Sequence, residues 1–451
     1  MRTEKVVVDF IRNFSFNQIP EDVLQVVKNV VLIVCGTTIA GKKEEGIWSL
    51  YQYYKKLGGI EEATVFMFND KLPAEHAALI NGAMARALDY CDAMVPGLHM
   101  GSTAVPVALA SSEITGHVSG KEFLTALTIG LEVGSRLNLT EEAYNGFDPT
   151  GIVSGFVATS IASRLLKLDE RECWNALGLS LNRAGGSFQS NIDGTLAVRV
   201  VQGWTAYTGI MCARYARHGI TGPLNFLEGI YGYYHLYGRD LLSAESAYKN
   251  IGNEFYLKNT VFKKFPACGA TQSSIEAILE LVKERGLKAR EVESIKIEVT
   301  PYVYNLVGHE FKIGDNPRVD AQFNIKYCVA SSLLRGSCRL EHFEESYVKD
   351  PTVNSIVDRI EVIPCKELDQ INHTAIRMSV KTKNNVEYLK EINVAPGFPG
   401  NPLTEEEHLE RFLTLTDYGN VDRMKARRII DFVSNLEFME DVKDLIGYMR
   451  P

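Results

Sequence analysis

The stretch Ser294-Ile295-Lys296-Ile297-Glu298-Val299 marks the point at which a long helical sequence changes its pattern. Its apolar residues recur at every second position, which is the period of a strand with one buried face. The same alternation returns in Arg359-Ile360-Glu361-Val362, and two further apolar runs, residues 375–380 and 386–389, flank Asn384-Asn385. An asparagine pair between two apolar runs is typical of a tight β-hairpin turn. These patterns predict a sheet.

Helical periodicity accompanies the predicted strands and fills the chain before them. Apolar residues recur with helical spacing at about 271–286 and 321–335, so the sheet region is predicted to be α+β. Before about residue 265 one helical segment follows another, and Pro20-Glu21-Asp22 places proline and two acids in a first helical turn. Several of these segments carry small residues, which let helices approach closely. The first part of the chain is therefore predicted to be a compact helical core.

The end of the chain returns to helical periodicity. Pro396-Gly397-Phe398-Pro399-Gly400 interrupts the pattern, and Thr404 with Glu407 then forms a capping box that starts a new helix. At 451 residues the chain is long for a single hydrophobic core. We therefore expect a mainly α fold with two domains, a helical domain from both chain ends and an inserted α+β lid domain: residues 1–268 with 398–451, and residues 269–397.

Composition limits the partners and the compartment. The formal net charge of −8 argues against an extended nucleic-acid surface, and an anionic substrate would need basic groups that are gathered locally. The N-terminus lacks a signal-peptide apolar region, and the apolar stretch Val30–Ala40 is too short to span a membrane, so it predicts a buried helix. Eight scattered cysteines without a CxxC pair fit reduced thiols in a cytoplasmic protein.

The usual cofactor signatures are absent from the sequence. It contains no GxGxxG after a strand, no phosphate-binding loop, no HExxH and no GxSxG. Its nine histidines are dispersed, and no pair has the spacing of metal ligands. We therefore expect a protein that needs neither a metal nor another cofactor.

A polar cluster at a helix end is the first candidate site. Asp89-Tyr90-Cys91-Asp92 follows an alanine-rich helical segment, and His99 precedes a second, nearly featureless one. An acid and a histidine held between two buried helices can act as an oriented acid/base pair. The alternative is a helix-end aspartate beside a hydrogen-bonded core histidine.

Two further clusters lie at and after the expected domain junction, where small-molecule sites often form. Lys263 in Lys263–Gln272 can neutralise a substrate carboxylate or act as a base, and the alternative is a solvated lysine pair before a helix cap. The other cluster, Pro317–Tyr327, leads into a helix and is a candidate part of the site. The alternative is that it forms only a capped amphipathic helix with an exposed tyrosine, Tyr327.

In their order and spacing these clusters resemble the MmgE/PrpD family, which includes 2-methylcitrate dehydratase, cis-aconitate decarboxylase and iminodisuccinate epimerase. The resemblance implies the two-domain fold described above, a homodimer, and action on small carboxylic acids at a carbon next to a carboxylate. It covers nearly the whole chain and rests on the following stretches: Asn81–Ser102, Gly146–Gly151, Gly194–Gly203, Thr221–Gly229, Lys263–Cys268, Asp320–Tyr327 and Gly400–Thr404.

The resemblance also implies roles for individual residues. His99 would be the acid/base, Asp89 its orienting partner, Lys263 the carboxylate anchor and Tyr327 a donor to the substrate, because the chemistry needs a positioned base and groups aimed at developing negative charge. The implied substrate contacts are Arg199, Cys268, Gln272 and Gln322.

The chain departs from the family pattern at several of these positions. Asp148 stands where the family keeps a histidine, Val198 where it keeps a lysine, and Gln272 where it keeps another histidine. We expect Asp148 to have taken over part of the proton transfer. The leading expectation is a dehydratase or hydratase. The alternatives are an isomerase or epimerase, a decarboxylase, or a non-catalytic binding protein, and the substrate is either a free acid or a thioester.

Overall fold

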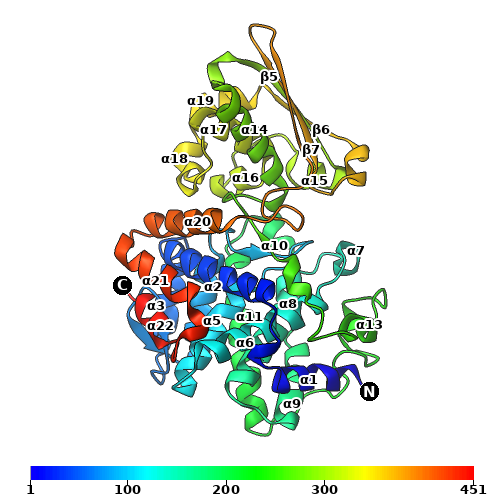
Figure 1. Cartoon of the computed structure of the whole chain (residues 1–451), viewed down its shortest axis with the longest axis vertical. Coiled ribbons are helices and arrows are strands. Elements are labelled where there is room, and N and C mark those ends of the chain that lie inside the picture. The colour runs from blue at the N-terminus through cyan, green and yellow to red at the C-terminus, as the bar shows by residue number, and fades with distance from the viewer. Residues whose placement is uncertain (1) are drawn as a thin grey trace. The chain divides into compact units, whose positions relative to one another are not determined.

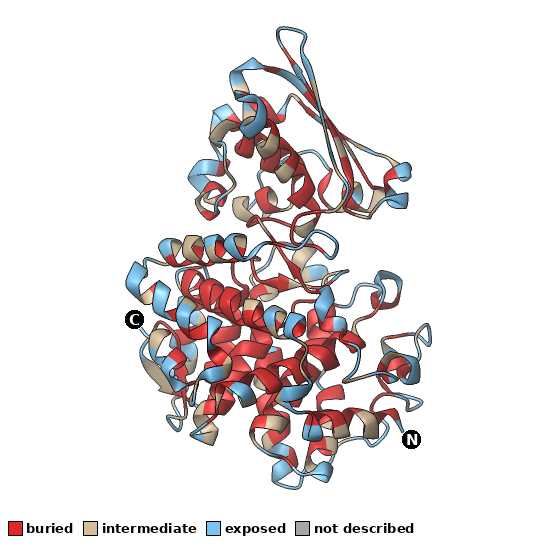
Figure 2. Ribbon diagram, in the orientation of Figure 1, coloured by how far each residue is buried: buried red, intermediate tan, exposed pale blue. Residues whose placement is uncertain are grey.

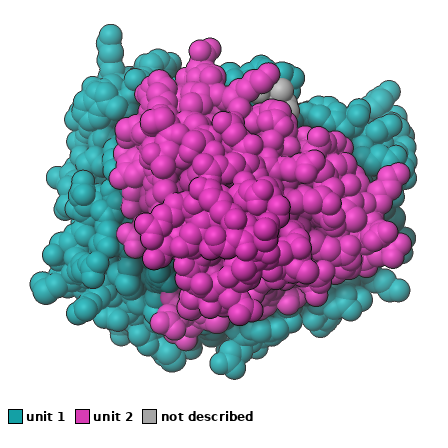
Figure 3. Space-filling view, turned by 90° about the horizontal axis from the view of Figure 1, so that it is seen from above, with its two compact units in different colours: residues 1–260, 408–451 teal, residues 261–407 magenta. Residues whose placement is uncertain are grey.

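The structure is a computed structural model that describes residues 2–451, except for the side chain of residue 192. These residues divide into two compact units, which Figure 3 shows in different colours. Unit 1 runs to Thr260 and resumes at His408, and unit 2 is Val261–Glu407. The sequence analysis predicted domain boundaries at 268/269 and 397/398, and these remain predictions. With 58% of its residues in helices, the protein has the expected mainly α fold with a separate α+β part.

Unit 1 is built from helices that come from both ends of the chain (Figure 1). They are α1 (Thr3–Asn13), α2 (Glu21–Gly41), α3 (Ile47–Leu57), α4 (Ala74–Arg86), α5 (Gly101–Thr115), α6 (Gly120–Leu137), α7 (Glu141–Tyr144), α8 (Pro149–Leu165), α9 (Glu170–Leu181), α10 (Gln189–Ile192), α11 (Ala197–Arg217), α12 (Tyr233–Leu236), α13 (Ala244–Tyr248), α20 (Glu405–Tyr418), α21 (Arg423–Ser434) and α22 (Lys443–Tyr448). The short strands β1 (Ala63–Val65) and β2 (Asp70–Leu72) form an antiparallel pair, and β3 is Asp92–Ala93.

Small residues allow the central helices α4, α5, α8 and α11 to pack closely. Most of the helical residues at the centre of unit 1 are buried (Figure 2). A Cβ atom on Gly82 of α4 would lie 3.1 Å from the carbonyl oxygen of Ser102 in α5 and 3.2 Å from that of Gln202 in α11. A Cβ atom on Gly203 would lie 2.5 Å from the carbonyl oxygen of Leu79. Glycine is therefore required where these backbones meet.

Helix α2 confirms the buried helix that was predicted at Val30–Ala40. Among the described residues it alone is long and apolar enough to cross a membrane, yet 72% of its apolar window is buried in the structure. The aromatic ring of Phe412 and the side chain of Leu415, both in α20, would each lie 3.0 Å from a Cβ atom on its Gly36. The helix thus packs against other helices, as a core helix does.

The end of the chain packs into unit 1. Helix α21 contacts α2, and α22 contacts α5. The ammonium of Lys28 in α2 donates to the carbonyl oxygen of Ser434 at 2.8 Å and forms an ion pair of 2.6 Å with Glu437. The backbone N–H of Gly120 donates to the carbonyl oxygen of Met439 at 2.8 Å. These contacts tie α21 and the turn after it to α2 and α6.

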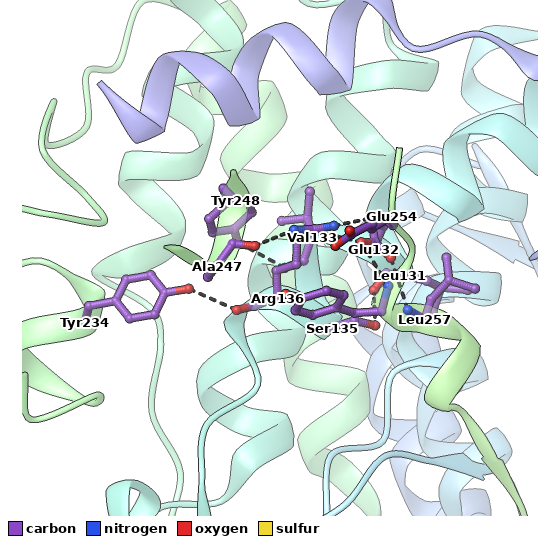
Figure 4. Close-up of polar contacts among 11 residues, drawn as sticks. Leu131, Glu132, Val133, Ser135, Arg136, Tyr234, Ala247, Tyr248, Glu254 and Leu257 are labelled. Carbon is purple, nitrogen blue, oxygen red and sulfur yellow. Dashed lines mark hydrogen bonds and ion pairs between the residues drawn. The ribbon is translucent and has the colours of Figure 1, made fainter. Parts of the chain in front are cut away.

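A buried ion pair on α6 holds the segment 247–257 in place (Figure 4). Glu132 and Arg136 lie one helical turn apart, pair at 2.6 Å and are almost completely buried. The Glu132 carboxylate accepts from the backbone N–H of Leu257 at 3.1 Å, and the Arg136 guanidinium donates to the carbonyl oxygens of Ala247 and, at 2.6 Å, Glu254. Both charges are therefore satisfied by each other and by backbone groups.

Unit 2 is the predicted α+β part. Its principal sheet has the order β6-β5-β7-β8, with β5 parallel to β6 and antiparallel to β7. Asn385 has a φ of 60° in the turn between β7 and β8, so the predicted hairpin is confirmed. The strands are β4 (Val261–Phe262), β5 (Val292–Val299), β6 (Ile360–Pro364), β7 (Ile376–Thr382) and β8 (Glu387–Ile392). The helices are α14 (Gln272–Arg285), α15 (Pro301–Val307), α16 (Pro317–Gln322), α17 (Ile325–Arg335), α18 (Glu345–Val348) and α19 (Pro351–Val357).

The core of unit 2 lies between the sheet and two of its helices. Helix α14 contacts β7 and β8, while α17 contacts β6, and the two helices contact each other. Ile295 and Ile297 of β5 are buried, as their period-two spacing predicts. The predicted capping box is also present, since Thr404 Oγ1 accepts from the N–H of Glu407 at 3.2 Å and Glu407 accepts from the N–H of Thr404 at 2.8 Å.

Candidate functional site

A turn at the end of α4 places an acid beside a buried cation. The helix ends at Arg86, and the backbone N–H of Asp89 donates to the carbonyl oxygen of Arg86 at 3.0 Å. Asp89 has a φ of 52°, a left-handed conformation that aspartate tolerates better than most residues. This turn directs the Asp89 carboxylate back to the Arg86 guanidinium, and the two form an ion pair. Both side chains are largely buried, so the pair is strong in this environment.

His99 is held in a defined orientation by its neighbours. Its Nδ1 lies 2.7 Å from the carbonyl oxygen of Asp92. Because a carbonyl oxygen only accepts, Nδ1 must carry a proton, and in the neutral ring the lone pair is then on Nε2. The backbone of His99 is fixed as well, since its N–H donates to Thr150 Oγ1 at 3.0 Å and its carbonyl accepts from Ser154 Oγ at 3.2 Å. Hydrogen bonds thus fix both the ring and the backbone of His99.

Asp148 lies close to both features. It caps α8, where its Oδ1 accepts from the N–H groups of Thr150 at 2.8 Å and Gly151 at 3.1 Å. Burial raises the pKa of the Asp148 carboxyl, although these hydrogen bonds and the charge of Arg86 oppose the shift. Thr150 bonds to Asp148 through its backbone and to His99 through its hydroxyl. Thr150 therefore connects the Asp148 carboxylate to the backbone of His99 through two hydrogen bonds.

Two charged residues to which the sequence analysis gave no role complete this part of unit 1, namely Asp92, which it quoted within the first cluster, and Arg411. Asp92 Oδ2 accepts from the N–H of Gly101 at 2.9 Å, and burial raises the pKa of the Asp92 carboxyl. Arg411, in α20, donates through Nη2 to the carbonyl oxygen of Tyr90 at 3.3 Å. The sequence analysis also gave no role to Arg86, although an arginine within an otherwise small and apolar helix is a local signal that could have identified it. No local pattern distinguishes Arg411.

Arg199, an expected substrate contact, forms a hydrogen bond and an ion pair with residues that follow α2. Its Nη1 donates to the carbonyl oxygen of Glu45 at 2.9 Å, and Nη2 lies 3.9 Å from the Glu44 carboxylate. Both acids follow α2. This placement favours a role in fixing the start of α11 against that turn, and a substrate contact by Arg199 stays a prediction.

Two family models match the chain: the MmgE/PrpD N-terminal domain over residues 5–242 and the MmgE/PrpD C-terminal domain over residues 265–437. The chain belongs to the MmgE/PrpD family. It is 25% identical over 461 aligned positions to human cis-aconitate decarboxylase, covering 98% of this chain and 93% of the human protein. It is 24% identical to mouse cis-aconitate decarboxylase, with 96% and 90% of the two chains covered. A cis-aconitate decarboxylase-like protein of Aspergillus oryzae is 25% identical, with coverage of 96% and 94%.

In this MmgE/PrpD protein, the expected site residues of unit 2 fall into two groups. The first surrounds the segment 263–268. Lys263 is only 4% exposed, so the alternative of a solvated lysine pair is wrong. Its neighbour Lys264 is paired with Glu276 at 2.7 Å and Glu407 at 2.9 Å.

Two glutamines hold the backbone of that segment. Gln272 accepts from the N–H of Phe265 at 2.9 Å and donates to the carbonyl oxygen of the same residue at 3.0 Å. The side chain of Gln322 donates through Nε2 to the carbonyl oxygen of Pro266 at 2.9 Å. The backbone carbonyl oxygen of Gln322 accepts from the N–H of Cys268 at 3.0 Å. These contacts favour a role for Gln272 and Gln322 in shaping the segment that carries Lys263 and Cys268.

Tyr327 forms the second group in unit 2 and lies in its core. The side chain is fully buried, not exposed as the amphipathic-helix alternative had it, and its ring lies 5.1 Å from that of Phe311 and 5.9 Å from that of Phe343. Its hydroxyl donates to the carbonyl oxygen of His342. A hydroxyl has one proton to give, so this bond favours a structural role over donation to a substrate.

Among residues 2–451, no three His, Cys, Asp or Glu side chains gather as a metal ion would require. The acid/base groups of unit 1 are instead organised around backbone hydrogen bonds and two arginines. Independence of cofactors stays a prediction, which exhaustive chelation of the active protein would test.

Proposed function

We propose that the chain is a lyase that acts at a carbon next to a carboxylate of a small polycarboxylic acid, and that its leading reaction is the elimination or addition of water. Its membership of the MmgE/PrpD family and the names of its relatives support a reaction of the dehydratase or decarboxylase type. The observation that carries the choice of elimination is the 2.7 Å contact between His99 Nδ1 and the carbonyl oxygen of Asp92. In the neutral imidazole this contact places the lone pair on Nε2, the atom to which we assign the role of base.

In the proposed elimination, His99 Nε2 takes the proton from the carbon beside a substrate carboxylate. The electron pair of that C–H bond forms the new double bond, and hydroxide leaves from the neighbouring carbon. The carboxyl of Asp148, whose raised pKa favours the protonated form, donates the proton that completes a water molecule. Negative charge that builds on the substrate carboxylate is stabilised by the field of Arg86.

Decarboxylation is the second candidate, because the similar human and mouse proteins are named as cis-aconitate decarboxylases. In that reaction the electron pair of the breaking C–C bond remains on the substrate, and carbon dioxide leaves. The substrate then takes up a proton, which a protonated His99 would supply. A reaction limited by the base form of His99 becomes faster as pH rises, and one limited by its acid form becomes slower.

The test is turnover of citrate, 2-methylcitrate and cis-aconitate by the purified full-length protein in D₂O. Proton NMR follows the products and the uptake of deuterium, and the headspace is assayed for carbon dioxide. Interconversion of hydroxy acid and alkene identifies a dehydratase, carbon dioxide identifies a decarboxylase, and deuterium uptake without a new product identifies an epimerase. Absence of all three would overturn the proposal.

A matched pair of variants connects the activity to the site. His99→Gln removes the base and should lower kcat by about 10²- to 10⁴-fold, the usual contribution of a positioned general base. His117→Gln is the control, because the side chain of His117 is 71% exposed and pairs with Asp441 elsewhere in unit 1. Equal activity of both variants would remove His99 from the mechanism.

A further inference from the structure

Arg411 presents a buried positive charge that the protein only partly satisfies. The residue is 4% exposed, and its guanidinium lies over the ring of Tyr90, 4.8 Å from the ring centre. Nη2 donates to the carbonyl oxygen of Tyr90 at 3.3 Å. Within residues 2–451, Nε and Nη1 have no hydrogen-bond partner, although both atoms are buried.

A guanidinium cannot shed its charge as a lysine or histidine can, so its remaining N–H groups need acceptors. Asp92, two residues beyond Tyr90 in the chain, interacts electrostatically with Arg411. No ion pair joins these two among the described residues. Asp92 Oδ2 binds the N–H of Gly101 instead, and Asp92 Oδ1 has no partner in the described chain. Buried donors of this kind are normally satisfied by water or by a ligand.

The position of Arg411 connects it to the proposed base. It bonds to the backbone at Tyr90, and two residues later the carbonyl oxygen of Asp92 holds His99 Nδ1 at 2.7 Å. The acceptor that completes Arg411 would therefore lie in the same region of unit 1 as His99. A carboxylate supplies both the acceptor atoms and the negative charge that a buried guanidinium lacks.

We infer that Arg411 is a substrate-binding residue, which holds a carboxylate of the substrate that takes no part in bond breaking. This inference rests on the proposed function, since it assigns one of the carboxylates of a polycarboxylic acid. It further implies that the protein distinguishes acids by the number of their carboxylates. A substrate that lacks the carboxylate bound by Arg411 leaves that guanidinium buried and unpaired.

The test is binding of two unreactive probes by titration calorimetry: propane-1,2,3-tricarboxylate and glutarate, which is the same carbon chain without the central carboxylate. Wild-type protein should prefer the tricarboxylate. Arg411→Gln should weaken tricarboxylate binding by about 10- to 100-fold, as expected for a charge-assisted hydrogen bond, and should reduce the preference over glutarate. Arg427→Gln is the control, because Arg427 is exposed on α21.

The outcomes separate this inference from the proposed function. If wild-type protein binds neither probe, the proposed substrate class is wrong, and the role of Arg411 falls with it. If wild-type protein prefers the tricarboxylate and folded Arg411→Gln keeps that preference within about twofold, Arg411 is structural and only the inference fails. If Arg411→Gln does not fold, Arg411→Lys decides: a 3- to 10-fold loss of tricarboxylate affinity is expected, and unchanged affinity overturns the inference.

Discussion

Asp148→Asn should separate the capping role of this residue from its proposed role in proton transfer. Asparagine caps helices about as well as aspartate, and its Oδ1 can keep the bonds from the N–H groups of Thr150 and Gly151 at 2.8 and 3.1 Å. Asp148→Ala loses both bonds, which costs about 0.5–2 kcal/mol in the free energy of unfolding. We therefore expect near wild-type stability at acidic pH for the asparagine variant and a lower melting temperature for the alanine variant.

The stability difference between Asp148→Asn and wild type should depend on pH in a defined direction. Burial raises the pKa of Asp148 above its ordinary value of 3.8, so the folded protein holds this proton more tightly than the unfolded chain does. The resulting stabilisation is present below pH 3.8 and is lost as pH rises through the raised pKa. The asparagine variant has no such proton to lose. Relative to wild type, it should become more stable as the pH rises above 3.8 and through the raised pKa of Asp148.

Turnover measurements test the second role of Asp148, its proposed part in proton transfer. If Asp148 supplies the proton to the leaving group, Asp148→Asn should lower kcat by about 10²- to 10⁴-fold and remove one limb of the pH–rate profile. Denaturant unfolding at several pH values and initial rates over the same range are the two assays. An asparagine variant with unchanged kcat and an unchanged pH profile would refute the proton-transfer role and leave Asp148 as a helix cap only.

Three further variants test other parts of the structure. Arg136→Met leaves Glu132 buried without its partner and should lower the free energy of unfolding in urea by about 3–5 kcal/mol. The loss should be smaller at acidic pH, where Glu132 takes up a proton. A loss under about 1 kcal/mol would contradict the stabilising role of the ion pair. Tyr327→Phe leaves a buried carbonyl unsatisfied, so unfolding should be easier by about 1–3 kcal/mol while kcat stays within twofold of wild type; a large loss of kcat would restore its catalytic role. Gly101→Ala places a methyl group against the Asp92 carboxylate, so melting temperature and activity should both fall, and a neutral result would show that this contact relaxes freely.

Period-two patterns and capping signals predicted the fold because they are local. The alternation in Ser294–Val299 lies within β5, Asn384-Asn385 forms the turn between β7 and β8, and Thr404 with Glu407 caps α20. Each signal acts over a few residues, so no knowledge of tertiary contacts is needed to interpret it. The start of unit 2 at Val261 has no comparable breaker signal, and the sequence placed that boundary later in the chain.

The candidate site depends on contacts that the sequence does not display. The cluster at Asp89 and His99 was found because an acid and a histidine lie close together between two helices. Arg411 bonds to Tyr90 across 321 positions of sequence, and nothing around it indicates that it is buried. The sequence around Tyr327 suggested a site residue, but the structure places its hydroxyl against a backbone carbonyl. That partner, His342, lies fifteen positions away in the sequence, so no local pattern indicates the contact.

The charges of the candidate site bear on how a protein with a net charge of −8 would bind the proposed polyanionic substrate. Unit 1 gathers two buried guanidiniums, Arg86 and Arg411, beside three carboxyl groups, Asp89, Asp92 and Asp148. Fully ionised, these groups would carry a net negative charge and repel a substrate carboxylate. Burial raises the pKa of both Asp92 and Asp148, so a bound anion would favour their protonated forms further. A proton on Asp148 would neutralise one charge of the site, and it would also be the proton that the proposed elimination consumes.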